Sequence, residues 1–350
     1  MNRKILFVIG GLKRGGAERV TVVLAKQFHH AGWDVSITTL LLNDVDYELN
    51  EGIHVIDLTT DRTSRIASIP KWLLGIRKTV KEIRPDVIIS FVARINILTQ
   101  IACKGIIENI IVSERNDPSC DGRGCLIDIA TKILYPRAQI VVFQTKRAQK
   151  YFNTKIQKNS VIIPNPISVD VQAKIVDSKK IVSVGRLAKQ KNHKLLINAF
   201  FRVLQNYPEY KLWIYGDGEL GPVLSEQVIK LGIEDKVFFP GNVLDIHAQI
   251  SDAEMFVLSS DYEGLSNALL EAMMMGLPCI STNCAGSDEV IQDEANGLLV
   301  PVGDETALYM AMDRLITNRK LRYTIAQNAK KEAEKFKTEN IFHKWLEIVD

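Results

Sequence analysis

Two glutamates, Glu263 and Glu271, stand with seven residues between them in the stretch EGLSNALLE. The mostly apolar residues 255–260 before them predict a buried strand, and residues 268–275 predict a short helix that stops at Gly276. Free backbone N–H groups and the helix dipole meet at the start of such a helix. The spacing therefore predicts an anion site with carboxylates beside it.

This combination fits a ligand that carries both hydroxyl groups and phosphates. Carboxylates accept hydrogen bonds from hydroxyls, whereas the backbone amides of Leu265, Ser266 and Asn267 can hold phosphate oxygens. A sugar joined to a nucleotide through a diphosphate would use both kinds of group.

Two further turns have the composition of phosphate-binding loops. The first, GGLKRGG, ends at Gly15 and Gly16, between a predicted strand and an amphipathic helix. It matches neither the GxGxxG fingerprint nor a Walker loop, so a plain strand-to-helix turn is an alternative. The second, GRLAKQKN, brings the planar fork of Arg186 and the point charge of Lys191 to the end of another predicted strand. A solvated basic turn is the alternative there.

Two shorter turns also follow predicted buried strands. YGDGE contains Gly216, and GNV contains Asn242 and Val243. Backbone groups of either turn could contact a nucleotide base or ribose, although each is typical of a plain turn when taken singly.

The densest polar group in the first half is SERNDP, directly after a predicted strand at residues 110–113. We expect Glu114, Arg115, Asn116 and Asp117 to project from the strand end, where they could position an acceptor hydroxyl or a leaving phosphate. A second polar group should lie at the neighbouring strand end, and it comprises Ser90, Arg94 and Asn96.

The pair Asp44 and Asp46 has the DxD spacing with which metal-dependent nucleotide-sugar enzymes hold a divalent cation. It lies in the polar connection 42–50, with no other ligand signal nearby, so a surface loop is the better interpretation. The six histidines show no metal-ligand spacing, and the five cysteines form no CxxC pair or Cys/His cluster. We expect no metal, no disulfide framework and reduced thiols in a cytosolic protein.

A chain of 350 residues suits two domains. Its basic and apolar start is explained better by a first strand at residues 5–9 than by a signal peptide, and no segment has the length of a transmembrane helix. Residues 1–170 carry 24 Lys and Arg against 16 Asp and Glu, whereas residues 171–350 carry 20 against 25. A basic first half would be drawn to phospholipid or to a pyrophosphate-linked acceptor, the alternative being a solvated excess of lysines.

Short apolar strands alternate with amphipathic helices almost throughout, which predicts parallel sheets with helices on both faces. Both halves open with a strand that runs into a glycine-bearing turn, and IPNPI at residues 163–167 is a stiff crossing between them. We therefore expect an α/β chain of two Rossmann-like domains, 1–170 and 171–350, facing across a cleft. The helical pattern 71–83 is interpreted as a sheet-covering helix with Trp72 and Val80 facing inward, and a membrane-surface helix is the alternative.

In its motifs the chain resembles the retaining glycosyltransferases of family 4, which have the GT-B fold. The matching pieces span nearly the whole chain in the right order: the N-terminal Gly-Gly loop, IPNPI, GRL with Lys191, and the glutamate pair within EGLSNALLEAMMMGLPCI. The pairing of the EX7E element with the GRL element is specific, whereas either alone would be moderately so. A last helix that packs back on the N-terminal domain is expected as well.

The resemblance implies a role for each motif. Glu263 would bind hydroxyls of the donor sugar, Glu271 the ribose hydroxyls, and Arg186 with Lys191 would neutralise the diphosphate. Gly15 and Gly16 would help these two cations with the diphosphate from across the cleft. The amides of Gly264, Leu265 and Ser266 would meet the sugar and the phosphate. The family needs no metal or other cofactor, and electrostatic stabilisation takes that place.

One departure from the family pattern concerns the first domain. Many relatives have a histidine near the sugar, where this chain has SERNDP, and we leave open whether Arg115 or Asn116 replaces it. This version is similar to a subset in bacterial surface-polysaccharide gene sets that often transfers galactose or N-acetylgalactosamine.

We therefore expect a retaining, metal-independent transfer of a hexose or N-acetylhexosamine, UDP-GalNAc or UDP-Gal being favoured as donor. The acceptor would be a lipid-pyrophosphate-linked oligosaccharide of capsule, exopolysaccharide or O-antigen synthesis. The partners would include an anionic membrane surface but no nucleic acid, with the protein cytoplasmic and peripheral on the inner face of the membrane. One alternative is a UDP-sugar epimerase or hydrolase of similar fold, which would want a general acid/base pair. The other is a non-catalytic nucleotide-binding scaffold.

Overall fold

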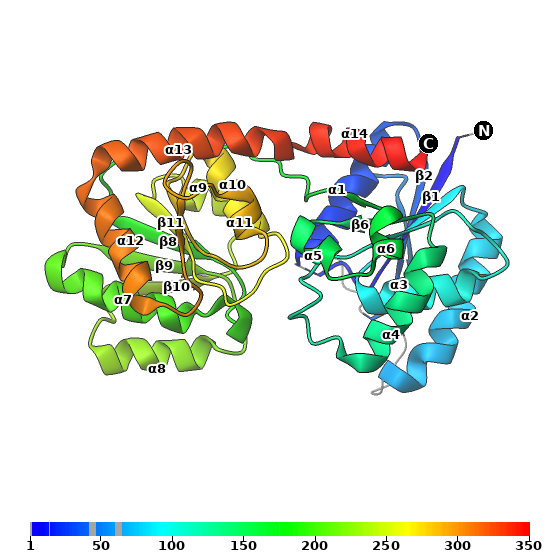
Figure 1. The fold of residues 1–350 in the computed structure, drawn as a ribbon, viewed down its shortest axis with the longest axis horizontal. Helices are drawn as coiled ribbons and strands as arrows, with labels where there is room; N and C mark the ends of the chain where they lie inside the picture. The colour runs from blue at the N-terminus through cyan, green and yellow to red at the C-terminus, as the bar shows by residue number, and fades with distance from the viewer. Residues whose placement is uncertain (1, 14, 42–46, 60–64, 175) are drawn as a thin grey trace. The chain divides into compact units, whose positions relative to one another are not determined.

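The computed structural model describes residues 2–13, 15–41, 47–59, 65–174 and 176–350 (Figure 1). They form two compact units, each with its own parallel sheet. The first unit contains the described residues up to Pro166 together with Thr338–Asp350, and the second is Ile167–Lys337. The division thus lies slightly before residue 170, and the last helix belongs to the first unit.

The first unit has a seven-stranded sheet in the order β3-β2-β1-β4-β5-β6-β7. All its strand pairs are parallel. The strands are β1 Lys4–Ile9, β2 Asp34–Thr39, β3 His54–Asp57, β4 Val87–Phe91, β5 Ile110–Ser113, β6 Ile140–Phe143 and β7 Ser160–Ile162. The helices are α1 Gly16–His30, α2 Arg65–Ile83, α3 Ala93–Cys103, α4 Gly124–Leu134, α5 Lys146–Lys150, α6 Thr154–Lys158 and α14 Thr338–Val349.

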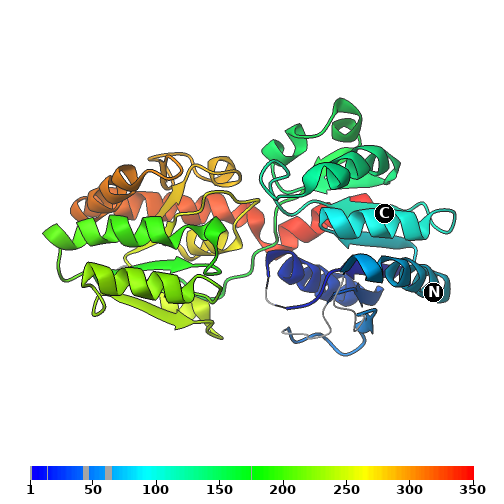
Figure 2. The same ribbon diagram turned by 90° about the horizontal axis from the view of Figure 1, so that it is seen from below.

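Helices cover both faces of this sheet (Figure 2). Helices α1 and α14 pack with one set of alternate strand residues, and α2 and α3 pack with the other set. Trp72 and Val80 of α2 are buried, which confirms the expectation that this segment covers the sheet. In α14, Trp345 is fully buried, with its ring 6.4 Å from that of Phe91.

The second unit has a six-stranded sheet in the order β10-β9-β8-β11-β12-β13. Its pairs are parallel as well. The strands are β8 Lys180–Val184, β9 Lys211–Tyr215, β10 Val237–Gly241, β11 Met255–Leu258, β12 Cys279–Thr282 and β13 Leu298–Val300. The helices are α7 His193–Asn206, α8 Gly221–Leu231, α9 Ile246–Ile250, α10 Asn267–Met275, α11 Ser287–Val290, α12 Glu305–Thr317 and α13 Arg319–Ala333.

Two hydrophobic clusters, one on each face, hold the second unit together. Helices α7, α8 and α12 contribute to one cluster, and α9 and α10 contribute to the other. Helix α13 contributes to both, through Ile325 on one side and Ala329 and Ala333 on the other. Both units are therefore three-layered α/β structures.

Replacing Trp345 by alanine should lower the free energy of unfolding of the first unit by about 3–5 kcal/mol, because it empties a fully buried indole site. Urea unfolding followed by far-UV circular dichroism measures this. Lys344→Ala, on the exposed side of the same helix, is the control. Equal unfolding midpoints for the two variants would show that α14 does not support this core.

Candidate active site

Five turns of the second unit follow β8, β9, β10, β11 and β12 at the carboxyl edge of the sheet, because all these strands are parallel. Two of them carry most of the site and are named here: the GRL turn, residues 185–192, and the EGL turn, residues 259–267. The edge collects the residues predicted for this half of the chain: Arg186, Lys191, Gly216, Asn242, Val243, Glu263, Gly264, Leu265, Ser266, Asn267 and Glu271. Open parallel sheets bind their ligands at this edge.

An ion pair joins the two named turns. Lys191 Nζ lies 2.5 Å from Glu263 Oε1, and the exposed fractions of these side chains are only 16% and 8%. The Ser260 hydroxyl donates to the same carboxylate oxygen at 2.6 Å, and Gln190 Nε2 donates to the other at 3.4 Å. Both oxygens of Glu263 are thus engaged, as a partly buried carboxylate requires.

Further hydrogen bonds fasten the GRL turn to the EGL turn. The Asp261 amide donates to the Gln190 carbonyl at 2.8 Å, and Gln190 Nε2 donates to the Tyr262 carbonyl at 2.9 Å. Asn192 Nδ2 donates to Asp261 Oδ1 at 2.7 Å, while its own Oδ1 accepts from the Leu195 amide and caps α7. The two turns therefore form one structural element.

Two glycines let neighbouring turns approach closely. Gly216 has a φ of 129°, and a Cβ there would overlap the carbonyl of Gly185 in the GRL turn. Gly286 has a φ of 84°, and a Cβ there would overlap the carbonyl of Gly264 in the EGL turn. Both positions need glycine for steric as well as for conformational reasons.

The two glutamates of the EX7E motif, Glu263 and Glu271, lie in different kinds of structure. Only Glu271 lies in a helix, within α10, whereas Glu263 belongs to the turn before it. Glu271 is nearly buried, and its Oε2 lies 3.2 Å from Nε2 of His247 on α9. Ser266 caps α10, accepting from the Leu269 amide at 3.4 Å.

The cations of the GRL turn also differ from one another. Lys191 is engaged with Glu263, whereas the guanidinium of Arg186 is exposed and has no hydrogen bond or ion pair with any residue that the structure describes. His193, which directly follows the turn, is buried. Burial, followed by the neighbouring charge of Lys191, lowers the pKa of its imidazole to about 3. His193 is therefore neutral at pH 7 and is no general acid.

In the first unit, three of the four side chains expected to project from the end of β5 are buried, namely Glu114, Arg115 and Asp117. Arg123 donates to both oxygens of Glu114, at 3.3 and 3.1 Å, and Tyr135 donates to it as well. Burial raises the pKa of this carboxyl group. Asp117 accepts from the Ser119 amide at 2.9 Å and shapes the following turn.

Arg115 is buried too. Its Nη1 donates to Asn165 Oδ1 at 2.9 Å, and its guanidinium lies 5.0 Å from the ring centre of Phe91 and 5.6 Å from that of Trp345. Burial lowers the pKa of Arg115 to about 9. Asn116, between these buried neighbours, is the exposed member of the group.

Asn96 and Ser90 lie next to this group. Asn96 on α3 donates to the Ser113 carbonyl at 3.1 Å and to the Tyr135 hydroxyl at 3.0 Å. Ser90 lies on β4, next to β5, as expected. Gly15 precedes the first turn of α1, and the Tyr47 hydroxyl is 3.3 Å from its backbone N and O.

Two expectations concern metals and membranes. Asp44 and Asp46 lie outside the described residues. Within the described ranges, no group of three or more His, Cys, Asp or Glu side chains could hold a metal ion. Across the same ranges no helix is both long and apolar enough to cross a membrane.

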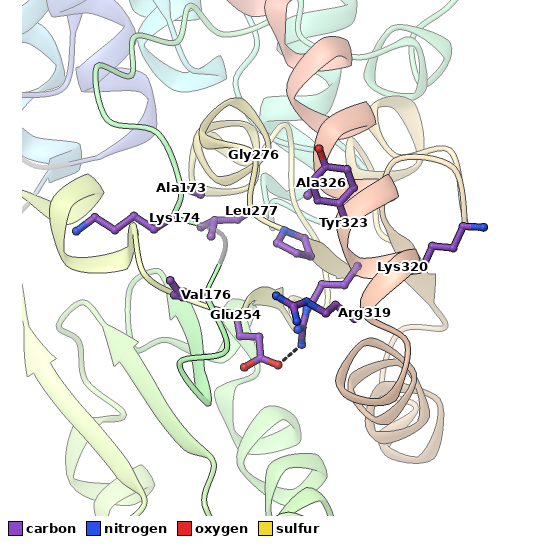
Figure 3. A pocket seen from close by; sticks show the side chains of 13 residues that line it. Ala173, Lys174, Val176, Glu254, Gly276, Leu277, Arg319, Lys320, Tyr323 and Ala326 are labelled. Carbon is purple, nitrogen blue, oxygen red and sulfur yellow. Dashed lines mark hydrogen bonds and ion pairs between the residues drawn. The ribbon is translucent and has the colours of Figure 1, made fainter.

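A cavity of about 500 Å³ lies at the opposite, amino-terminal edge of the second sheet (Figure 3). Two of its charged residues, Arg322 and Glu254, pair with each other, and Arg322 also lies 2.6 Å from Asp177, which does not line the cavity. Lys174 and Lys320 point outward on opposite sides of it (Figure 3). None of the predicted site residues lines this cavity.

Comparison with known proteins agrees with the motifs. Residues 166–332 match the family described as glycosyl transferases group 1, and residues 5–113 match glycosyl transferase 4-like proteins. A Campylobacter jejuni relative, "GalNAc-alpha-(1->4)-GalNAc-alpha-(1->3)-diNAcBac-PP-undecaprenol alpha-1,4-N-acetyl-D-galactosaminyltransferase", is 28% identical over 99% of this chain and 98% of its own. The amylovoran biosynthesis glycosyltransferase AmsD of Erwinia amylovora is 24% identical over 99% of each chain.

Solved structures share the architecture. Sucrose-phosphate synthase from Thermosynechococcus elongatus has a TM-score of 0.87 at 18% identity, covering 99% of this chain and 98% of its own. HepE from Anabaena, in complex with UDP, has a TM-score of 0.84 at 21% identity, with 98% of each chain covered. At 18% and 21% identity, the structural similarity shows only that these proteins share the fold of this chain. The family matches and the relatives show what the chain is: a glycosyltransferase of the GT-B type, similar to the group 1 glycosyl transferases over residues 166–332 and to glycosyl transferase 4-like proteins over residues 5–113.

Proposed function

We propose that this glycosyltransferase moves a hexose or N-acetylhexosamine, with N-acetylgalactosamine or galactose favoured, from a UDP-sugar to a lipid-pyrophosphate-linked oligosaccharide. The Lys191–Glu263 pair at the carboxyl edge of the second sheet is the observation that carries the proposal, because it places a carboxylate beside a cation. The sugar and acceptor classes are supported by two C. jejuni relatives whose names specify N-acetylgalactosaminyl transfer to undecaprenol-linked glycans.

The proposed donor site assigns a task to each turn. Glu263 orients the sugar hydroxyls, and Arg186 with Lys191 meets the negative charge that grows on the departing UDP. Glu271 accepts the ribose hydroxyls. Backbone groups at Gly216, Asn242 and Val243 meet the base and ribose, and those at Gly264, Leu265, Ser266 and Asn267 meet the sugar and the phosphates.

We propose a retaining reaction without a metal ion. The acceptor hydroxyl attacks the anomeric carbon on the face from which UDP leaves, and a diphosphate oxygen takes the hydroxyl proton as the sugar–phosphate bond breaks. Glu263 is engaged by Lys191 and Ser260, which fits an orienting role better than that of a nucleophile. His193 directly follows the GRL turn, and its lowered pKa keeps the imidazole neutral at pH 7, without the extra proton of an imidazolium.

For the first unit we propose acceptor binding. Asn116 is exposed and is the candidate for direct contact, whereas Arg115 holds the loop in place through Asn165. The start of α1, at Gly15 and Gly16, offers a helix N-terminus for a phosphate.

A peripheral position on an anionic membrane fits this acceptor. Leu126, Ile129 and Ile133 of α4 are exposed, with fractions of 82%, 48% and 56%, at a spacing that places them along one side of the helix. Residues 1–170 carry eight more basic than acidic side chains. An apolar stripe on a basic unit is typical of interfacial helices.

Glu263→Gln should lower kcat about 100-fold or more, because the amide keeps the shape of the side chain but loses its charge beside Lys191. UDP release from a panel of UDP-sugars in the presence of a lipid-linked acceptor measures this. Glu234→Gln, at an exposed loop position, is the control. Near wild-type turnover of a folded Glu263→Gln protein would contradict the assignment.

Arg186→Ala should raise KM for the UDP-sugar about 10- to 100-fold, as expected for the loss of charge-assisted hydrogen bonds to a diphosphate. Lys189→Ala removes an exposed cation from the same turn and should have little effect. Initial rates over a range of donor concentrations separate the two variants. If both change KM equally, Arg186 contributes only general positive charge.

Replacing Leu126, Ile129 and Ile133 together by glutamine should reduce binding to anionic vesicles about tenfold or more, because the burial of three apolar side chains is lost. Flotation across salt concentrations measures this. Val223 and Ile229, exposed on α8 of the other unit, provide the matched control when both are changed to glutamine. Unchanged flotation of the α4 variant would exclude this helix as the membrane contact.

A further inference from the structure

Glu271 has a neighbour that the sequence motifs do not include. His247 lies on α9, whose first residue, Ile246, follows Val243 by only three positions. Its Nε2 is 3.2 Å from Glu271 Oε2, and the exposed fractions of the two side chains are 16% and 5%. Glu271 thus meets a side chain from the segment that leads out of the GNV turn.

The position of His247 is fixed from the backbone upward. Asp245 caps α9, and its Oδ1 accepts from the Ala248 amide at 3.1 Å. Ile250, at the end of the same short helix, is buried in the core that also contains Leu270 of α10. Helix α9, which carries His247, is therefore fixed by its cap at one end and by packing against the core that contains α10 at the other.

A carboxylate can accept about four hydrogen bonds, so a bond from His247 leaves capacity for a ligand. A pair of neighbouring ribose hydroxyls donates two hydrogen bonds in a fixed geometry. A carboxylate accepts both hydrogen bonds only when the plane of its carboxyl group has the right orientation. A hydrogen bond from another side chain of the protein is the usual means of fixing that orientation. An Nε2–H donor at 3.2 Å meets that need for Glu271.

We propose that His247 is a positioning residue that orients Glu271 toward the ribose hydroxyls, and so sets the preference of the enzyme for ribonucleotide over deoxyribonucleotide donors. This inference rests on the ribose-binding role proposed for Glu271. His247 extends the nucleotide site to α9, which follows the GNV turn. Its hydrogen bond with Glu271 links α9 to α10.

The test is the binding of UDP and of 2′-deoxy-UDP to the full chain by isothermal titration calorimetry. In His247→Ala the affinity for UDP should fall about 2- to 12-fold, the range for one typical hydrogen bond, because Glu271 keeps its charge and loses only a partner that orients it, and the affinity for 2′-deoxy-UDP should fall less. His247→Gln keeps an N–H donor and should restore most of the preference for UDP. Gln249→Ala, exposed on the same helix, should leave both affinities unchanged.

A parallel measurement on Glu271→Gln separates the two proposals. If Glu271→Gln loses the preference for UDP while His247→Ala keeps it, the inference about His247 is wrong and the role of Glu271 stands. If Glu271→Gln keeps the preference, the ribose role itself is wrong. If the affinities for UDP and for 2′-deoxy-UDP fall equally in His247→Ala, and His247→Gln does not restore the preference for UDP, then His247 serves only the packing of α9.

Discussion

A partly buried ion pair between Lys191 and Glu263 fastens two turns together at the carboxyl edge of the second unit's sheet. It joins turns that are 72 residues apart in the chain, one after β8 and one after β11, two neighbouring strands. Withdrawing both charges from water is costly unless hydrogen bonds satisfy them. Ser260 and Gln190 supply those bonds. The carboxylate and the ammonium group are therefore held in place before any ligand binds, which is the condition for electrostatic catalysis.

The first unit uses its polar residues differently. Glu114 and Arg115 are conspicuous in the sequence because charged residues directly follow a buried strand. In the structure both are buried: Glu114 accepts from Arg123, and Arg115 donates to Asn165. Asn116 is left exposed between them. At residues 114–117 the exposed side chain is thus the neutral amide of Asn116. The turns of the second unit, in contrast, carry charged side chains.

The sequence was sufficient to predict the fold class and the elements around the EX7E motif, because apolar strands, glycine turns and amphipathic helices leave strong local patterns. It missed β3, β7 and β13. It placed Glu263, Arg186 and Lys191 at one edge, since parallel strands require that. It could not predict that Arg115 is buried or that His247 reaches Glu271, because both contacts depend on packing between elements distant in sequence.

The central claim is that Lys191 and Glu263 act as one unit in the transfer reaction, and a double-mutant cycle tests it most directly. kcat/KM for the UDP-sugar would be measured for Lys191→Met, Glu263→Gln and the double variant. Because each single change already breaks the same pair, we predict that the double variant is scarcely worse than the poorer single variant. Losses that multiply in the double variant would contradict the account and show that the two residues act independently.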